Sequence, residues 1–159
     1  MFRRFLSTFG KSSSVKTQSS PADLAQLQDA VVHSIVGDIT DLHDGEWGAR
    51  EWVHIAVNHE VLIEEGRRSS TQTAVLARIP GGELEDLSFR LGAGSKAKLL
   101  ELRDAMSNDE RTWTIVDLTI ERNGHYAFNF SYEPPPRLNG NLLHSPLSGI
   151  LDRYKTQNP

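Results

Sequence analysis

The sequence predicts a single α+β domain: an antiparallel β-sheet with helices packed mainly on one face, in the order α-β-β-β-α-β-β-α. Three observations predict it. The 159 residues and 17.8 kDa suit one domain, and 38% hydrophobic residues can fill its core. An apolar stripe at helical spacing begins after residue 20. Further along, alternating apolar residues are separated by tight turns, as in antiparallel hairpins.

The first 20 residues differ in composition from the rest. Residues 1–20 contain four basic residues and no acid, and the Gly, Ser and Thr of residues 10–20 are typical of a linker. We therefore predict a flexible basic leader over 1–20 and one folded domain over 21–159. Phe2, Phe5, Leu6 and Phe9 leave open an amphipathic turn on a membrane surface. Because neither a signal-peptide core nor an apolar run of membrane-spanning length occurs, the expected location is the cytoplasm.

The first predicted helix starts at Pro21. Ser20 can cap it, proline suits the first helical position, and Asp23 lies at the positive end of the helix dipole. Apolar residues then recur at spacings of three and four over about five turns. They are Leu24, Leu27, Val31, Ile35, Ile39 and Leu42.

Three strands and a second helix are predicted next. Residues 51–58 alternate as a strand, and an extension through residue 63 is left open. Residues 65–70 form a turn and residues 72–79 the returning strand. A weaker strand covers residues 84–91, and a helix covers 95–106.

The last hairpin has a register that the sequence itself selects. A two-residue turn at Asn123-Gly124 would mix polar and apolar side chains on both faces. A three-residue loop, with Gly124 in the left-handed conformation, pairs Leu118 with Phe128 and Val116 with Phe130. One face then becomes wholly apolar, which favours this register and predicts that Phe128 is buried core.

Prolines mark the end of the sheet. A Pro-rich loop is predicted over residues 134–145, because proline cannot donate to the hydrogen-bond ladder. A terminal helix is predicted over residues 146–156.

The sequence lacks the motifs of several classes of catalytic, metal and cofactor sites. Without cysteine there is no disulfide, thiolate metal site or cysteine nucleophile. His54 and His59 would lie on opposite faces of a strand, and no HExxH or nucleophile elbow occurs. Gly92–Lys96 lacks the P-loop spacing, which leaves at most a weak anion site at the helix N-terminus. We expect no metal, no cofactor and no enzymatic activity.

The charge distribution indicates a basic protein partner. Residues 21–159 hold 13 basic and 21 acidic residues, and eight of these acids lie within residues 38–65 beside a single base, Arg50. Such a body repels nucleic acid and attracts cations. The turns after the first helix and at the hairpin tip are the expected contact points; their acids are Asp41, Asp44, Glu46, Glu64 and Glu65. The alternative is that these acids only keep the protein soluble.

Two segments of the last predicted hairpin follow a recognisable order. In Trp113–Ile120 a tryptophan opens a strand, and in Asn123–Tyr132 a glycine turn leads into an aromatic strand that ends in tyrosine. These segments resemble the YezG-like antitoxin family, the immunity proteins of bacterial polymorphic toxin systems. The helix at Leu99–Arg103 and an early tryptophan, Trp47 or Trp52, fit the same order. The resemblance covers about residues 21–135.

The resemblance implies a small, non-enzymatic protein that binds and neutralises a cognate toxin, often a nuclease. Two other classes stay open. An effector chaperone or adaptor for a secretion system could use the same acidic surface, and an enzyme could hold an unrecognised acidic site in the turn after the first helix.

Overall fold

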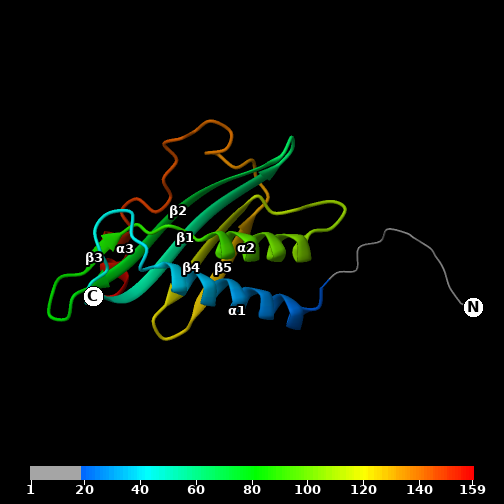
Figure 1. The fold of residues 1–159 in the computed structure, drawn as a ribbon. Coiled ribbons are helices and arrows are strands. Elements are labelled where there is room, and N and C mark those ends of the chain that lie inside the picture. The colour runs from blue at the N-terminus through cyan, green and yellow to red at the C-terminus, as the bar shows by residue number, and fades with distance from the viewer. Residues whose placement is uncertain (1–18) are drawn as a thin grey trace, which may run out of the picture.

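The computed structural model describes residues 19–159 and confirms the predicted α+β fold and element order (Figure 1). The leader predicted over residues 1–20 lies almost wholly outside this range. The elements are α1 (Pro21–Asp38), β1 (Glu51–Ile63), β2 (Arg67–Arg78), β3 (Glu85–Leu87), α2 (Ala93–Met106), β4 (Ile115–Glu121), β5 (Tyr126–Ser131) and α3 (Ile150–Gln157). No helix within residues 19–159 is both long and apolar enough to cross a membrane.

The five strands form one antiparallel sheet in the order β3-β2-β1-β4-β5. Helices α1 and α2 lie side by side on one face of this sheet (Figure 1). Their buried side chains join those of the strands in the main core, which includes Val31, Ile35, Leu99, Leu118 and Trp113. Helix α3 packs on the opposite face, where Ile150 meets Ala56, Ala74 and Leu76.

Helix α1 begins as its sequence predicts and ends earlier. The Ser20 hydroxyl accepts a hydrogen bond from the Asp23 amide, and the Asp23 carboxylate accepts one from the Ser20 amide, a complete capping box. The helix stops at Asp38, so Ile39 and Leu42 are buried from the following loop rather than from a helical stripe.

In the β1–β2 hairpin, the first strand has the extension that the sequence leaves open, and the second strand starts earlier than predicted. Strand β1 continues through Ile63, and β2 starts at Arg67 rather than at residue 72. The polar run from Arg67 to Ser70 has the composition of a turn, but it pairs with β1 in regular register. The weaker third strand, expected over residues 84–91, is reduced to Glu85–Leu87, with one further bridge between Leu42 and Phe89.

The β4–β5 hairpin has the predicted register. Leu118 pairs with Phe128, Val116 pairs with Phe130, and Gly124 adopts a φ of +95° in the loop. Val116 and Leu118 are buried, as expected, but Phe128 is only half-buried. The expectation of a fully buried Phe128 is therefore wrong, because β5 is an edge strand that pairs only with β4 among residues 19–159.

The terminal helix starts later than predicted. The expected range was 146–156, but α3 covers Ile150–Gln157. Gly149 has a φ of +77°, and this left-handed residue interrupts the helical backbone between Ser148 and Ile150. Residues 146–149 form turns instead. Residues 134–145 run as the predicted Pro-rich loop, here called the strap.

Candidate partner-binding surface

The acidic loop (residues 39–50) connects α1 to β1 and is fixed on one side by Arg90. The Arg90 Nη1 atom donates to the Asp41 carboxylate at 2.8 Å and to the Leu42 carbonyl at 2.9 Å. Backbone hydrogen bonds from His43 to Ser88 and from Arg90 to Asp41 attach the loop to the segment after β3. Asp41 is therefore an anchor of the loop, and its charge is largely balanced.

Arg50 fixes the other side of the acidic loop. Its guanidinium donates to the carbonyls of Glu46 and Trp47 and forms a two-pronged ion pair with Glu85, at 3.0 and 3.1 Å. This contact raises the pKa of Arg50 and lowers that of Glu85. Trp47 packs against the core beneath the loop. The backbone is thus held at both ends and in the middle.

Asp44 and Glu46 are the free charges of this loop. Both are exposed, and within residues 19–159 neither carboxylate has a hydrogen-bond or ion-pair partner. Because the backbone is already ordered, a partner that binds these carboxylates orders few further groups. Asp86, which sequence reasoning did not select, lies close by and shares a cleft of about 330 Å³ with His43 and Ser88. Burial raises the pKa of Asp86.

The second predicted acidic site, at the hairpin tip, carries less net negative charge than the acidic loop. Glu64 and Glu65 are exposed, as expected for a turn. Arg67 and Arg68 follow directly and are also exposed, so the tip as a whole is close to neutral. At a distance, opposite charges this close together largely cancel, and the tip offers little long-range attraction to a basic partner.

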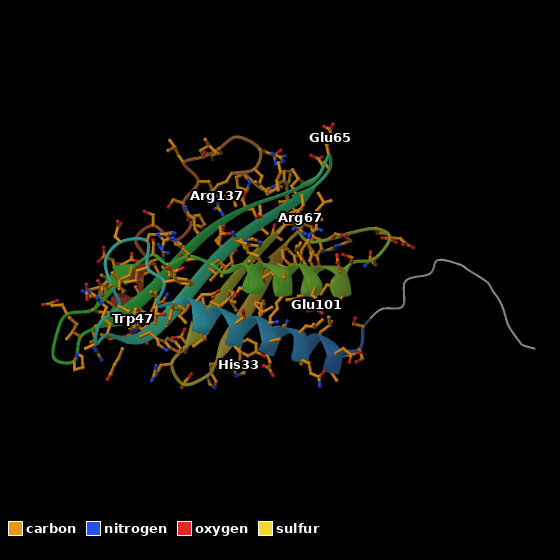
Figure 2. The ribbon with its side chains drawn as sticks, viewed as in Figure 1. His33, Trp47, Glu65, Arg67, Glu101 and Arg137 are labelled. Carbon is orange, nitrogen blue, oxygen red and sulfur yellow. The ribbon has the colours of Figure 1, made fainter. Side chains whose placement is uncertain are left out.

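The structure does not bring the five predicted acids together. Figure 2 shows Trp47, in the acidic loop, and Glu65, at the tip, at opposite ends of the β1–β2 hairpin. The 13 residues of β1 separate them, which corresponds to roughly 40 Å of extended strand. Asp41, Asp44 and Glu46 form one surface, and Glu64 and Glu65 form another at the far end of the hairpin.

One acid of the same run is not on the surface at all. Glu60 has no exposed area and lies beneath the strap, on the sheet face opposite α1 and α2. Its carboxylate accepts from the backbone amides of Arg137, at 3.3 Å, and Leu138, at 3.0 Å. The Arg137 Nη1 atom lies 3.5 Å from Glu60 Oε2, and the other guanidinium nitrogens donate to Ser70 and to the Asn58 carbonyl. Figure 2 labels Arg137 where the strap meets the hairpin.

The helix N-terminus that the sequence left open as an anion site is already occupied by the chain. Asp38, the last residue of α1, accepts from the Gly92 amide at 2.9 Å and from the Ser95 hydroxyl at 2.5 Å. A Cβ atom at Gly92 would approach the Asp38 carboxylate to 2.8 Å, so a larger residue there would force this carboxylate to shift. The Asp38 carboxylate supplies the cap that α2 lacks locally.

The histidines lie as the strand alternation predicts. His54 faces α3, where its ring centroid lies 5.0 Å from that of Tyr154. His59 faces α2, and its Nδ1 atom is hydrogen-bonded to the Thr71 hydroxyl at 2.8 Å. Within residues 19–159, no group of three or more His, Asp or Glu residues is arranged to hold a metal ion.

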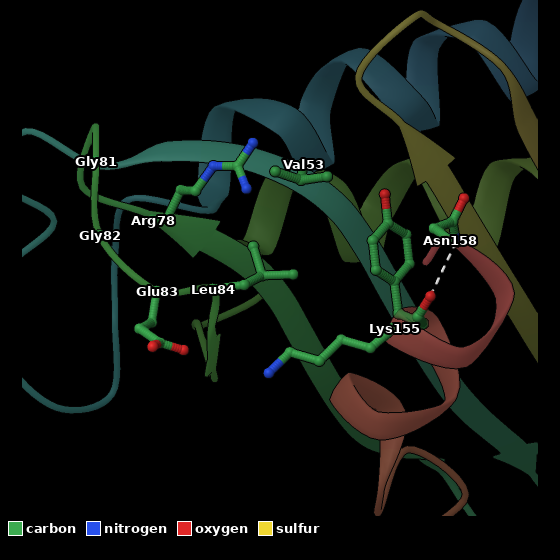
Figure 3. Close-up of a pocket in the computed structure, with 9 residues that line it drawn as sticks. Val53, Arg78, Gly81, Gly82, Glu83, Leu84, Lys155 and Asn158 are labelled. Atoms are coloured by element: carbon green, nitrogen blue, oxygen red, sulfur yellow. Dashed lines mark hydrogen bonds between the residues drawn. The ribbon is translucent and has the colours of Figure 1, made fainter.

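An open cleft of about 580 Å³ lies where α3 meets the start of β1 and the end of β2 (Figure 3). Glu83 and Lys155 extend toward it from opposite sides, with Arg78 above (Figure 3). The opposite charges on its walls favour neither an anion nor a cation. The acidic loop, by contrast, presents a single sign of charge.

Comparison with known proteins adds no assignment. The chain matches no model of a known protein family, and no curated protein matches it.

Proposed function

We propose that this chain is an immunity protein that binds and neutralises a cognate toxin through the acidic loop. The observation that carries the proposal is the ordered display of Asp44 and Glu46 by a loop clamped by Arg50 and Arg90. The resemblance of the last hairpin to YezG-like antitoxins supports the same class. The acidic balance of residues 21–159 favours a basic partner over nucleic acid.

The proposed toxin is a nuclease that acts in the cytoplasm. A nuclease binds phosphates with a basic groove, and two exposed carboxylates on a fixed loop can occupy or border such a groove. Charge complementarity mainly raises the association rate, which suits an inhibitor that must capture a toxin before it cuts. Inhibition by occupancy requires no catalysis and no cofactor from the inhibitor.

Co-expression with the product of the neighbouring open reading frame tests this function. If that product is toxic alone, we expect the chain to restore growth and the Asp44→Lys/Glu46→Lys variant to fail. Glu64→Lys/Glu65→Lys introduces the same charge change at the other end of the hairpin and serves as the matched control, which should still restore growth.

The same experiment distinguishes the alternative function. A chaperone or adaptor for a secretion system would bind the neighbouring product without relieving its toxicity. Binding without rescue therefore rejects the immunity function in favour of the adaptor. Rescue that is equally lost in both charge-reversal variants rejects the acidic loop as the inhibitory surface.

A further inference from the structure

A basic cleft lies between β2 and the first turn of α2, in a domain that is otherwise acidic. Two adjoining cavities of about 220 Å³ and 350 Å³ share Lys96 and Ser69 in their walls. Arg67 lines the smaller cavity and Arg90 the larger. Among the residues that the structure describes, no carboxylate lines either cavity, whereas Glu83, Asp86 and Glu121 each line one of three clefts elsewhere.

The positive groups of the basic cleft retain capacity for a ligand. Within the described part of the chain, Arg67 and Lys96 form no ion pair. Arg90 uses only its Nη1 atom to hold the acidic loop, which leaves Nε and Nη2 for another acceptor. The Ser69 hydroxyl lines both cavities and makes no hydrogen bond to another described residue.

His59 forms the inner wall of the smaller cavity and is itself 1% exposed. Its Nδ1 atom is paired with the Thr71 hydroxyl. Burial first, and then the charges of Lys96 and Arg137, lower the pKa of His59 to about 4. The imidazole is therefore neutral at physiological pH, and the positive potential that disfavours its protonation would favour a bound anion.

We propose that the basic cleft binds one phosphate group, as the free ion or as a small phosphate monoester. Lys96 and the Ser69 hydroxyl, which are common to both cavities, have the free Arg67 on one side and the Asp41-paired Arg90 on the other. Cationic and hydroxyl donors on several sides suit a tetrahedral dianion better than a planar carboxylate. The acidic surroundings disfavour a long polyanion, which would carry its other phosphates past repelling carboxylates. This proposal is independent of the proposed immunity function.

The chain offers two matched pairs of variants for a test. Lys96 lines the cleft, whereas Lys98 is two residues further along α2 and points to another side of the helix. Arg67 lines the cleft, whereas Arg68 reaches the opposite face of the sheet and donates to the Leu138 carbonyl. In each pair, the substitution by glutamine removes one positive charge, both from the residue that lines the cleft and from its control.

The experiment is a titration of the full chain, followed by amide NMR shifts, at constant pH and ionic strength. The probes are inorganic phosphate, glucose 6-phosphate and acetate. We expect saturable shifts with at least one phosphate probe, centred on Ser69 and Lys96, and no saturation with acetate. Lys96→Gln and Arg67→Gln should each weaken binding at least tenfold, while Lys98→Gln and Arg68→Gln keep parental affinity.

The relative affinities of the two phosphate probes identify the source of the group. Tighter binding of glucose 6-phosphate indicates a monoester ligand, and equal or weaker binding indicates the free ion. Linear shifts with both phosphate probes overturn the proposal. Equal losses in the cleft variants and their controls overturn it as well, because they would reflect net charge rather than a site.

Discussion

The two faces of the sheet are covered in different ways. On the face toward α1 and α2, aliphatic side chains from β1, β2 and β4 pack into the main core, with Leu118 and Ile55 among the most deeply buried. On the other face, near the hairpin tip, the strap is fixed by polar groups, above all the buried pair of Glu60 and Arg137. On the apolar face, packing is distributed over many aliphatic contacts. On the polar face, by which we mean the part of the other face near the hairpin tip, one network of polar groups holds the strap.

The difference matters because the two kinds of contact respond differently to mutation. Loss of an aliphatic group leaves a cavity whose cost depends on local repacking. Loss of one member of a buried ion pair leaves an uncompensated charge, although the intact pair itself adds little net stability. The polar contacts therefore fix where the strap lies more than they add to the free energy of unfolding.

The largest expected effect follows from this contrast. Arg137→Met leaves the Glu60 carboxylate buried without its counter-charge and should lower the free energy of unfolding by about 3–5 kcal/mol. Arg68→Met is the control, since Arg68 is exposed and makes a single bond to the strap; its cost should stay within about 1 kcal/mol. Urea denaturation measures both.

A double variant sharpens this prediction. Glu60→Met combined with Arg137→Met removes both charges and should recover part of the loss, because no buried charge is left unpaired. Recovery is incomplete, since Glu60 also accepts two backbone amides of the strap. A double variant that is as unstable as the sum of its single changes would contradict the account of the polar face.

The contrast between these faces also marks what the sequence can predict. The β4–β5 register follows from residue parity and the position of Gly124, and the capping box follows from Ser20 and Asp23, which are three residues apart. Glu60 and Arg137 are 77 residues apart, so no local pattern relates them. The same holds for Asp38, which caps a helix 54 residues further on through Gly92.

The sequence predicts individual residues of the candidate site but not the contacts that hold them in place. Turn position identified Asp44 and Glu46 as exposed acids, because charges in turns are readily solvated. That Arg50 and Arg90 clamp the loop depends on tertiary contacts. That Glu64 and Glu65 lie far from it depends on the length of β1, whose extension through residue 63 the sequence leaves open.

The second prediction compares the centre and the edge of the apolar face. Leu118→Ala, in the interior strand β4, should destabilise the fold by about 3–4 kcal/mol. Phe128→Ala, directly opposite on the edge strand, should cost about 2 kcal/mol, because the ring is only half-buried. Urea midpoints of the two variants measure the difference. A larger loss for Phe128→Ala would show that β5 is covered by more than the described contacts.

The third prediction concerns His59, a buried titratable group on the helix-facing side. Its pKa is lowered from 6.5 to about 4 in the folded state, so the unfolded chain binds more protons between these values. The stability of the fold should therefore fall as pH drops through this window, with no contribution above about 6.5 and the full loss below about 4. At pH 5 the expected loss from His59 is about 2 kcal/mol relative to pH 7.5.

Denaturation of His59→Gln at the same pH values isolates this contribution. Between pH 7.5 and pH 5, the free energy of unfolding of the variant should fall by about 2 kcal/mol less than that of the parent. His33→Gln, which replaces an exposed histidine on α1, is the control and should follow the parent curve. Parallel curves for the parent and His59→Gln would show that His59 does not resist protonation.

The smallest of these effects tests the central claim most directly: the acidic loop, and not the hairpin tip, meets the partner. Titration calorimetry against the product of the neighbouring open reading frame, the partner in our proposal, would compare Asp44→Lys/Glu46→Lys with Glu64→Lys/Glu65→Lys, with circular dichroism as the control for folding. The loop variant should bind at least tenfold more weakly at low salt, about 1.4 kcal/mol, and the difference from the parent should shrink as salt rises. The tip variant should keep parental affinity. Parental affinity of the loop variant, or an equal loss in both variants, would contradict the claim.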